Sequence, residues 1–167
     1  MIKKLLAAFA ALGLSSLSLS TFANGVGTVT VTQTFHNAVQ SIPSNVGGAN
    51  PCTGAPGTIT IVYNGVVHAT YQPSVGGLSN QWDHFQLVGD YAFVPDDTGT
   101  PSYAGHFVLM DNSGVNDHSF VTTATSTIHL VGSDGSSLNI RAVAHLTIVN
   151  PSSANPEIVV DHFRFSC

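Results

Sequence analysis

The chain has 167 residues, of which 43% are hydrophobic and only 8% are charged, whereas ordinary globular domains carry about 25% charged residues. Its four lysines and arginines are too few to neutralise a phosphate backbone, which excludes a nucleic-acid-binding protein. Runs of charge, which coiled coils and disordered tails need, are absent from the sequence as well. The length suits one domain with a core of its own.

The first 23 residues are typical of a secretory signal peptide. Two lysines precede an apolar stretch at residues 5–14, and the segment 21–23 places small residues where a signal peptidase requires them. We therefore expect cleavage after Ala23, which leaves residues 24–167 as a single domain. The apolar stretch is shorter than the roughly 20 residues that cross a bilayer. The mature chain is thus expected to have no membrane span and to be secreted or periplasmic.

Cleavage also removes both lysines and takes the formal charge from −5 to −7. A lysine Schiff base, a P-loop lysine and pyridoxal-phosphate attachment are thereby excluded, since each needs the lysine amine. The sequence contains no Gly-x-Ser-x-Gly, His-Glu-x-x-His or Gly-x-Gly-x-x-Gly motif either. We predict no cofactor, and the sequence leaves open whether the protein is an enzyme.

The chain has two cysteines, Cys52 in a loop rich in proline and glycine and Cys167 at the last position. In a chain exported to an oxidising compartment, two cysteines predict one disulfide bond. Two unrelated free thiols are the alternative. The bond would fasten the end of the chain to the loop that precedes an early strand.

Alternating Thr, Val, Ile and Phe residues recur along the mature chain, and no stretch has helical periodicity with capping residues. This pattern predicts an all-β domain. Asn64-Gly65 and Asp134-Gly135 are strong signals for two-residue hairpin turns, and long loops are expected at 43–56 and 95–101. The expected strands are eight, at about residues 26–36, 57–63, 66–72, 81–94, 103–111, 117–131, 137–149 and 157–165.

Strands joined by hairpins at this spacing favour an antiparallel meander. Eight strands of this length can close into a barrel whose interior holds side chains or a small ligand. Closure would also remove the exposed edges of the sheet. We therefore expect a closed eight-stranded barrel, and a two-sheet sandwich is the alternative that the same strands permit.

Histidine is abundant, but no pair has the short spacing that introduces a zinc site. If Asp134-Gly135 is a two-residue turn, His129 and His145 point to opposite faces and cannot bind one metal ion. If Asn64-Gly65 is another, His68 shares a face with apolar residues. We predict no metal site. The eight histidines are His36, His68, His84, His106, His118, His129, His145 and His162.

The tripeptide Asp-His-Phe occurs twice, at 83–85 and at 161–163. On a strand the Asp and the Phe share one face and the His lies on the other. If the Phe-rich faces point inward, burial raises the pKa of each Asp carboxyl, as in enzymes that use a carboxyl as a general acid. Hydrogen-bonded structural carboxylates are the alternative. The residues predicted to line a ligand site are Asp83, Phe85, His106, Asp161 and Phe163.

Several short segments resemble those of a family of small secreted bacterial all-β proteins without an assigned activity. The similarity covers about residues 50–167, consists mostly of turn signals, and supports export and the disulfide without implying functional residues. A weaker, topology-level similarity is to the eight-stranded barrels of allene oxide cyclase and dirigent proteins, which hold hydrophobic substrates. The segments are Pro51-Cys52-Thr53-Gly54, Val94-Pro95-Asp96-Asp97, Tyr103-Ala104-Gly105-His106-Phe107, Gly132-Ser133-Asp134-Gly135-Ser136 and Ala144-His145.

Three classes of function remain open from the sequence. The first, which we expect, is a secreted protein whose barrel binds a small, mainly apolar molecule. The second is a cyclase-type or isomerase-type enzyme that uses inward Asp or His side chains. The third is a structural or adhesive surface subunit that pairs through open strand edges. A closed barrel with a lumen would favour the first two, and an open edge would favour the third.

Overall fold

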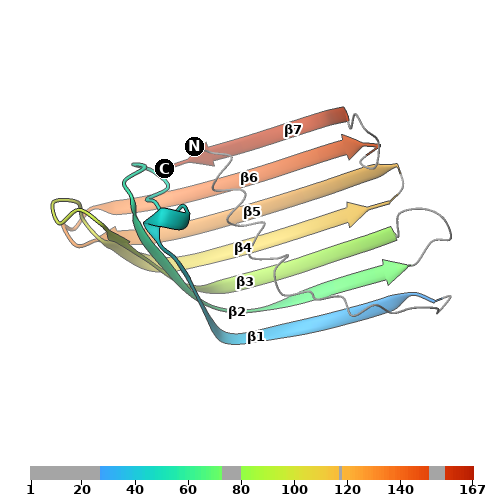
Figure 1. Cartoon of the computed structure of the whole chain (residues 1–167), viewed down its shortest axis with the longest axis horizontal. Helices are drawn as coiled ribbons and strands as arrows, with labels where there is room; N and C mark the ends of the chain where they lie inside the picture. Colours follow the sequence, from blue (N-terminus) through green and yellow to red (C-terminus); the bar gives the residue numbers. More distant parts are fainter. Residues whose placement is uncertain (1–26, 73–79, 117, 151–156) are drawn as a thin grey trace.

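The computed structural model describes residues 27–72, 80–116, 118–150 and 157–167. These residues form a single antiparallel sheet whose strands pair in chain order, so the sheet is a meander (Figure 1). The all-β prediction is confirmed, while the predicted signal peptide at 1–23 lies outside the described residues. The elements are β1 (Val29–Ile42), the 3-10 helix η1 (Ser44–Val46), β2 (Gly57–Gln72), β3 (Asn80–Pro95), β4 (Tyr103–Val115), β5 (Ser119–Gly132), β6 (Ser137–Val149) and β7 (Glu157–Ser166).

The hairpin expected at Asn64-Gly65 is wrong, because β2 runs straight through this dipeptide. The Asn64 side chain instead supports a β-bulge in the neighbouring strand: its Oδ1 accepts a hydrogen bond from the backbone N–H of Asn37 at 2.9 Å. Asn37 has φ +49° and lies where the register of β1 shifts, between Phe35 and Ala38. The two strands expected at 57–63 and 66–72 are therefore one long strand.

Gly65 has its own reason to be glycine. A Cβ atom at this position would collide with the backbone carbonyl oxygen of Gln86 on β3. The side-chain amide of Asn64 thus bonds the bulge of β1, and the missing side chain of Gly65 leaves room for the backbone of β3.

The turn predicted at Asp134-Gly135 is present between β5 and β6, but it is longer than two residues. Gly132 donates its N–H to the carbonyl of Ser136 at 2.7 Å, and Gly135 takes φ +82°. The longer turn moves the register by one residue, so His129 lies opposite Asn139 and not opposite Ile140. A shift of one residue exchanges the two faces of a strand; the expectation that His129 and His145 point to opposite faces is therefore wrong.

The described strands form one open sheet and not the closed barrel that we expected. Within the described residues β1 pairs only with β2, and β7 pairs only with β6. The physical reason follows from the merged strand. In a meander of seven strands the first and last strands run in the same direction, so the antiparallel pair that closes an eight-stranded meander cannot form between them.

The core lies on one face of this sheet, which we call the inner face. Ten buried side chains form one cluster there, and partly buried residues from β1 and β7 pack against it as well. Because both edge strands contact one cluster, the sheet must curve around it. The cluster consists of Ile61, Leu87, Tyr91, Phe93, Tyr103, Phe107, Leu109, Ile128, Leu130 and Ile140.

The loop between β1 and β2 crosses from one edge of the sheet to the other. Its Cys52 packs against the core cluster and forms the predicted disulfide with Cys167, with a Cα–Cα distance of 5.8 Å. Buried Asn50 shapes the loop, since its Oδ1 accepts hydrogen bonds from the backbone N–H groups of Cys52 at 2.9 Å and Thr53 at 3.1 Å. In Figure 1 this loop lies beside the C-terminus, beyond the end of β7.

Candidate functional site

The five residues predicted to line a ligand site do not gather at one place. Asp83, Phe85 and Phe163 belong to the inner face by the register of their strands. His106 lies on the opposite, outer face, where its side chain is 85% exposed. Asp161 pairs with Leu146 on β6, and its side chain lies outside the described part of the chain.

The inner face carries a pair of carboxylates on neighbouring strands. Asp83 on β3 pairs with Ser113 on β4, and Asp111 lies two residues away on β4, diagonally across from it. Gln81 donates its side-chain amide to Oδ2 of Asp83 at 2.6 Å. Thr122 donates its hydroxyl to Oδ1 of Asp111 at 2.8 Å. The second oxygen of Asp83 is buried and has no hydrogen-bond partner among the described residues.

Both carboxyls are held partly out of water, and this sets their acidity. Burial raises the pKa of the Asp83 carboxyl above its ordinary value of 3.8, while the hydrogen bond from Gln81 opposes the rise. Burial also raises the pKa of Asp111, the hydrogen bond from Thr122 opposes it, and the negative charge of Asp83 adds to it. Two like charges near each other on an apolar face favour protonation of at least one of them.

Replacement of these carboxylates should remove a pH dependence of stability. A carboxyl whose pKa is higher in the folded than in the unfolded state favours folding at low pH, and that contribution is lost as the pH rises through the folded-state value. We therefore expect the double variant Asp83→Asn/Asp111→Asn to have a higher urea midpoint than the wild type at pH 7, and an equal one at pH 3.

The matched control is Asp96→Asn, which changes an exposed carboxylate in the loop after β3. It should leave the pH dependence as it is in the wild type. A double variant whose midpoint tracks that of the wild type at both pH values would show that the two carboxyls are not desolvated in solution.

The outer face carries histidines in directly opposed pairs. His68 on β2 lies opposite His84 on β3, His106 on β4 opposite His129 on β5, and His145 on β6 opposite His162 on β7. Side chains directly opposite each other in a sheet have Cβ atoms about 5 Å apart. Six of the eight histidines of the chain therefore lie on one face.

Four of these histidines, in two of the pairs, belong to a single row that crosses the whole sheet. Hydrogen bonds join the row at three points: the Nδ1 atoms of His68, His84 and His145 bond the side chains of Thr32, Asn112 and Thr123 at 2.8, 2.6 and 2.8 Å. In each case a side chain of a neighbouring strand holds Nδ1, so the ring is oriented by the sheet. The row runs Thr32, His68, His84, Asn112, Thr123, His145 and His162.

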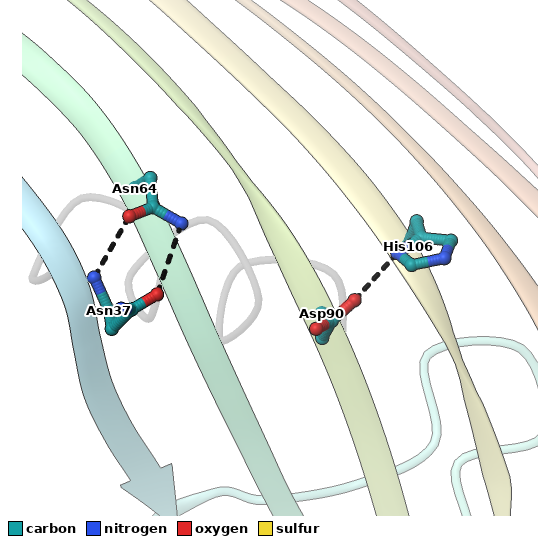
Figure 2. A network of polar contacts seen from close by, with 4 residues as sticks. All are labelled: Asn37, Asn64, Asp90 and His106. Carbon is teal, nitrogen blue, oxygen red and sulfur yellow. Dashed lines mark hydrogen bonds and ion pairs between the residues drawn. The ribbon is translucent and has the colours of Figure 1, made fainter.

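A second, shorter row contains the remaining pair. Nδ1 of His106 donates a hydrogen bond to Oδ1 of Asp90 on β3 at 2.6 Å (Figure 2). His129 is bonded through its Nδ1 to Oδ1 of Asn139 on β6. The four residues lie opposite one another in the order Asp90, His106, His129 and Asn139.

Sequence reasoning missed both the carboxylate partner and the histidine rows. The signal for Asp111 was available, because alternation from buried Phe107 and Leu109 places it on the inner face. The same alternation places His106 on the outer face. The rows themselves depend on the register between strands, which the misread turns concealed.

The chain matches no protein-family model, no curated protein and no solved structure. None of the helices in the described residues is long and apolar enough to cross a membrane. In the same part of the chain, no group of three or more His, Cys, Asp or Glu side chains is placed to hold a metal ion.

Proposed function

We propose that the protein is an exported structural subunit that associates with further copies of itself through the free edge of β1. The open sheet carries this proposal. In the described part of the chain β1 is bonded to β2 alone, so the N–H and C=O groups along its outer edge are available to another strand.

The first half of β1 is well suited to pairing. The segment Val29–Phe35 has no charged residue and no proline, and its register with β2 is unbroken. Six or seven residues with high β-propensity and low charge are the usual signature of a segment that pairs with its own kind. Its exposed side chains are threonines, which suit a strand and carry no repelling charge.

The opposite edge of the sheet, β7, carries charged residues, as strand edges that are protected from pairing often do. β7 contains Glu157 and Arg164, and charged side chains on an edge strand discourage further pairing. We therefore infer that the association is between two β1 strands, related by a two-fold axis and antiparallel, because such a contact is closed and self-complementary.

Export is part of this proposal. The disulfide between Cys52 and Cys167 is compatible with an oxidising compartment, where such bonds form and persist. The segment of β1 that would pair carries no charged residue, so no like charges meet between two copies of this strand.

A barrel that encloses a small apolar ligand has less support, since the strands described here do not close around a lumen. An enzyme of the barrel type meets the same objection, although Asp83 and Asp111 give the inner face two carboxyls of raised pKa. An open edge is the feature that favours a subunit over either of them.

The substitution Thr34→Lys tests the proposal. Thr34 is exposed on the regular part of β1, so a lysine there places a charge at the edge without entering the core. Sedimentation of residues 24–167, with the disulfide intact, should show concentration-dependent association in the wild type and a shift toward monomer in the variant.

Thr125→Lys is the matched control, because Thr125 is also exposed but lies on β5, between two other strands of the sheet. It should associate as the wild type does. A wild type that stays monomeric at every concentration, or two variants that lose association equally, would rule out an interface at β1.

A further inference from the structure

The pair formed by His106 and His129 differs from the other two histidine pairs in what holds its rings. His106 is bonded through Nδ1 to Asp90, and His129 through Nδ1 to Asn139. The first partner is a carboxylate and the second is an amide oxygen, so both accept a hydrogen bond. In a neutral imidazole the Nδ1 atom of each ring must then carry the proton.

It follows that Nε2 of both rings has a free lone pair. Figure 2 shows the second ring nitrogen of His106 on the side away from Asp90. Histidines that bind metal ions nearly always donate their other N–H to a carboxylate or a carbonyl oxygen, which fixes the tautomer and the ring orientation. Asp90 and Asn139 occupy these two supporting positions.

We propose that His106 and His129 bind a first-row transition-metal ion through their two Nε2 atoms. Imidazole nitrogen suits Cu²⁺, Zn²⁺ and Ni²⁺ and disfavours Ca²⁺ and Mg²⁺, which prefer oxygen. The two residues lie directly opposite each other on β4 and β5, at a spacing of about 5 Å between Cβ atoms. This spacing lets two rings converge on an ion bound at roughly 2.0–2.1 Å from each nitrogen. Water completes the coordination, since the site is on an exposed face.

The other two pairs are less well prepared. His68 and His145 bond to the hydroxyls of Thr32 and Thr123, and a hydroxyl donates as readily as it accepts. The tautomer of these rings is therefore not set by their partner. We assign the metal to the pair whose two Nδ1 atoms both face acceptors.

The experiment starts from a variant of the mature protein that breaks the other pairs, His68→Ala/His145→Ala. A calorimetric titration of this protein with zinc chloride alone should give one equivalent of bound Zn²⁺. In the same titration, nitrogen-15 spectra of the imidazoles should show the Nε2 resonances of His106 and His129 shifting together. Adding His106→Ala to the background should abolish binding.

Asp90→Ala tests the supporting contact, because the outer partner of a ligating histidine is worth roughly 10–100-fold in affinity. This variant should still bind zinc, at least tenfold more weakly, whereas His36→Ala should bind as the background does. His36 is exposed on β1 and belongs to none of the opposed pairs. The inference is overturned if the background binds no zinc, or if His106→Ala binds it unchanged. All the substituted side chains are exposed or half-buried, and urea midpoints will show that each variant is folded.

Discussion

The double substitution Cys52→Ala/Cys167→Ala should lower the free energy of unfolding by about 4 kcal/mol, as the loop-closure model gives for a long cross-linked loop. The two cysteines are separated by 115 residues, so the bond restricts most of the unfolded chain. It also holds the loop between β1 and β2 across the sheet, where Cys52 packs against the core. Equilibrium unfolding in urea measures the loss.

The control for this experiment is the wild-type protein unfolded in the presence of a reducing agent, which should lose the same stability as the double variant. A difference between them would measure packing lost with the sulfur atoms. If the double variant is as stable as the oxidised wild type, the loop does not depend on its tether, and the account of how the core is covered is wrong.

The substitution Phe93→Ala should cost a similar amount, about 3–5 kcal/mol, because it empties a fully enclosed position. Phe93 has no exposed surface and belongs to the core cluster. Its ring lies against the backbone of Gly57, where a Cβ atom would approach ring carbons to 2.6 Å. The backbone of β2 cannot easily collapse into the space that the ring leaves, so the cavity should persist.

Val94→Ala is the neighbouring control. Val94 points to the outer face and is 59% exposed, so its truncation should cost less than about 1 kcal/mol, the span of β-propensity. Equal losses from the two variants would mean that the inner face of β3 is no better enclosed than the outer one.

Much of the fold could be predicted from alternation alone. The expected strands at 81–94, 103–111 and 137–149 coincide with β3, β4 and β6 to within a few residues. The alternation of Asp83, Phe85 and Leu87 placed all three on one face, and the structure puts them there. Two cysteines in a sequence with a predicted signal peptide were enough to predict their bond.

The arrangement of the sheet could not be predicted in the same way. Asn64-Gly65 satisfies the local requirements of a tight turn, yet its amide supports a bulge at Asn37, 27 residues away. Nothing local distinguishes these two uses. Because a turn was predicted at this dipeptide, β2 was counted as two strands. The resulting count of eight strands led to the prediction of a closed barrel.

The faces on which the histidines lie were predicted wrongly for a similar reason. Asp134-Gly135 does mark a turn, but this turn is longer than two residues and is closed by the hydrogen bond from the N–H of Gly132 to the carbonyl of Ser136. The greater length of the turn changes the register between β5 and β6. With the shorter turn His129 and His145 are on opposite faces; with the observed one both lie on the outer face. The opposed histidines are thus a property of register, which sequence patterns specify only through turn geometry.

Hydrogen–deuterium exchange of single amides in β1 tests the central claim, which is that this edge of the sheet is free. In an edge strand, every second backbone N–H points away from the sheet and is open to solvent. In dilute, monomeric protein the amides of Val29–Phe35 should therefore alternate between slow and fast exchange, and the fast ones should slow down as the concentration rises. Uniformly slow exchange along this segment in the monomer would contradict the account, because it would mean that another part of the chain already pairs with β1.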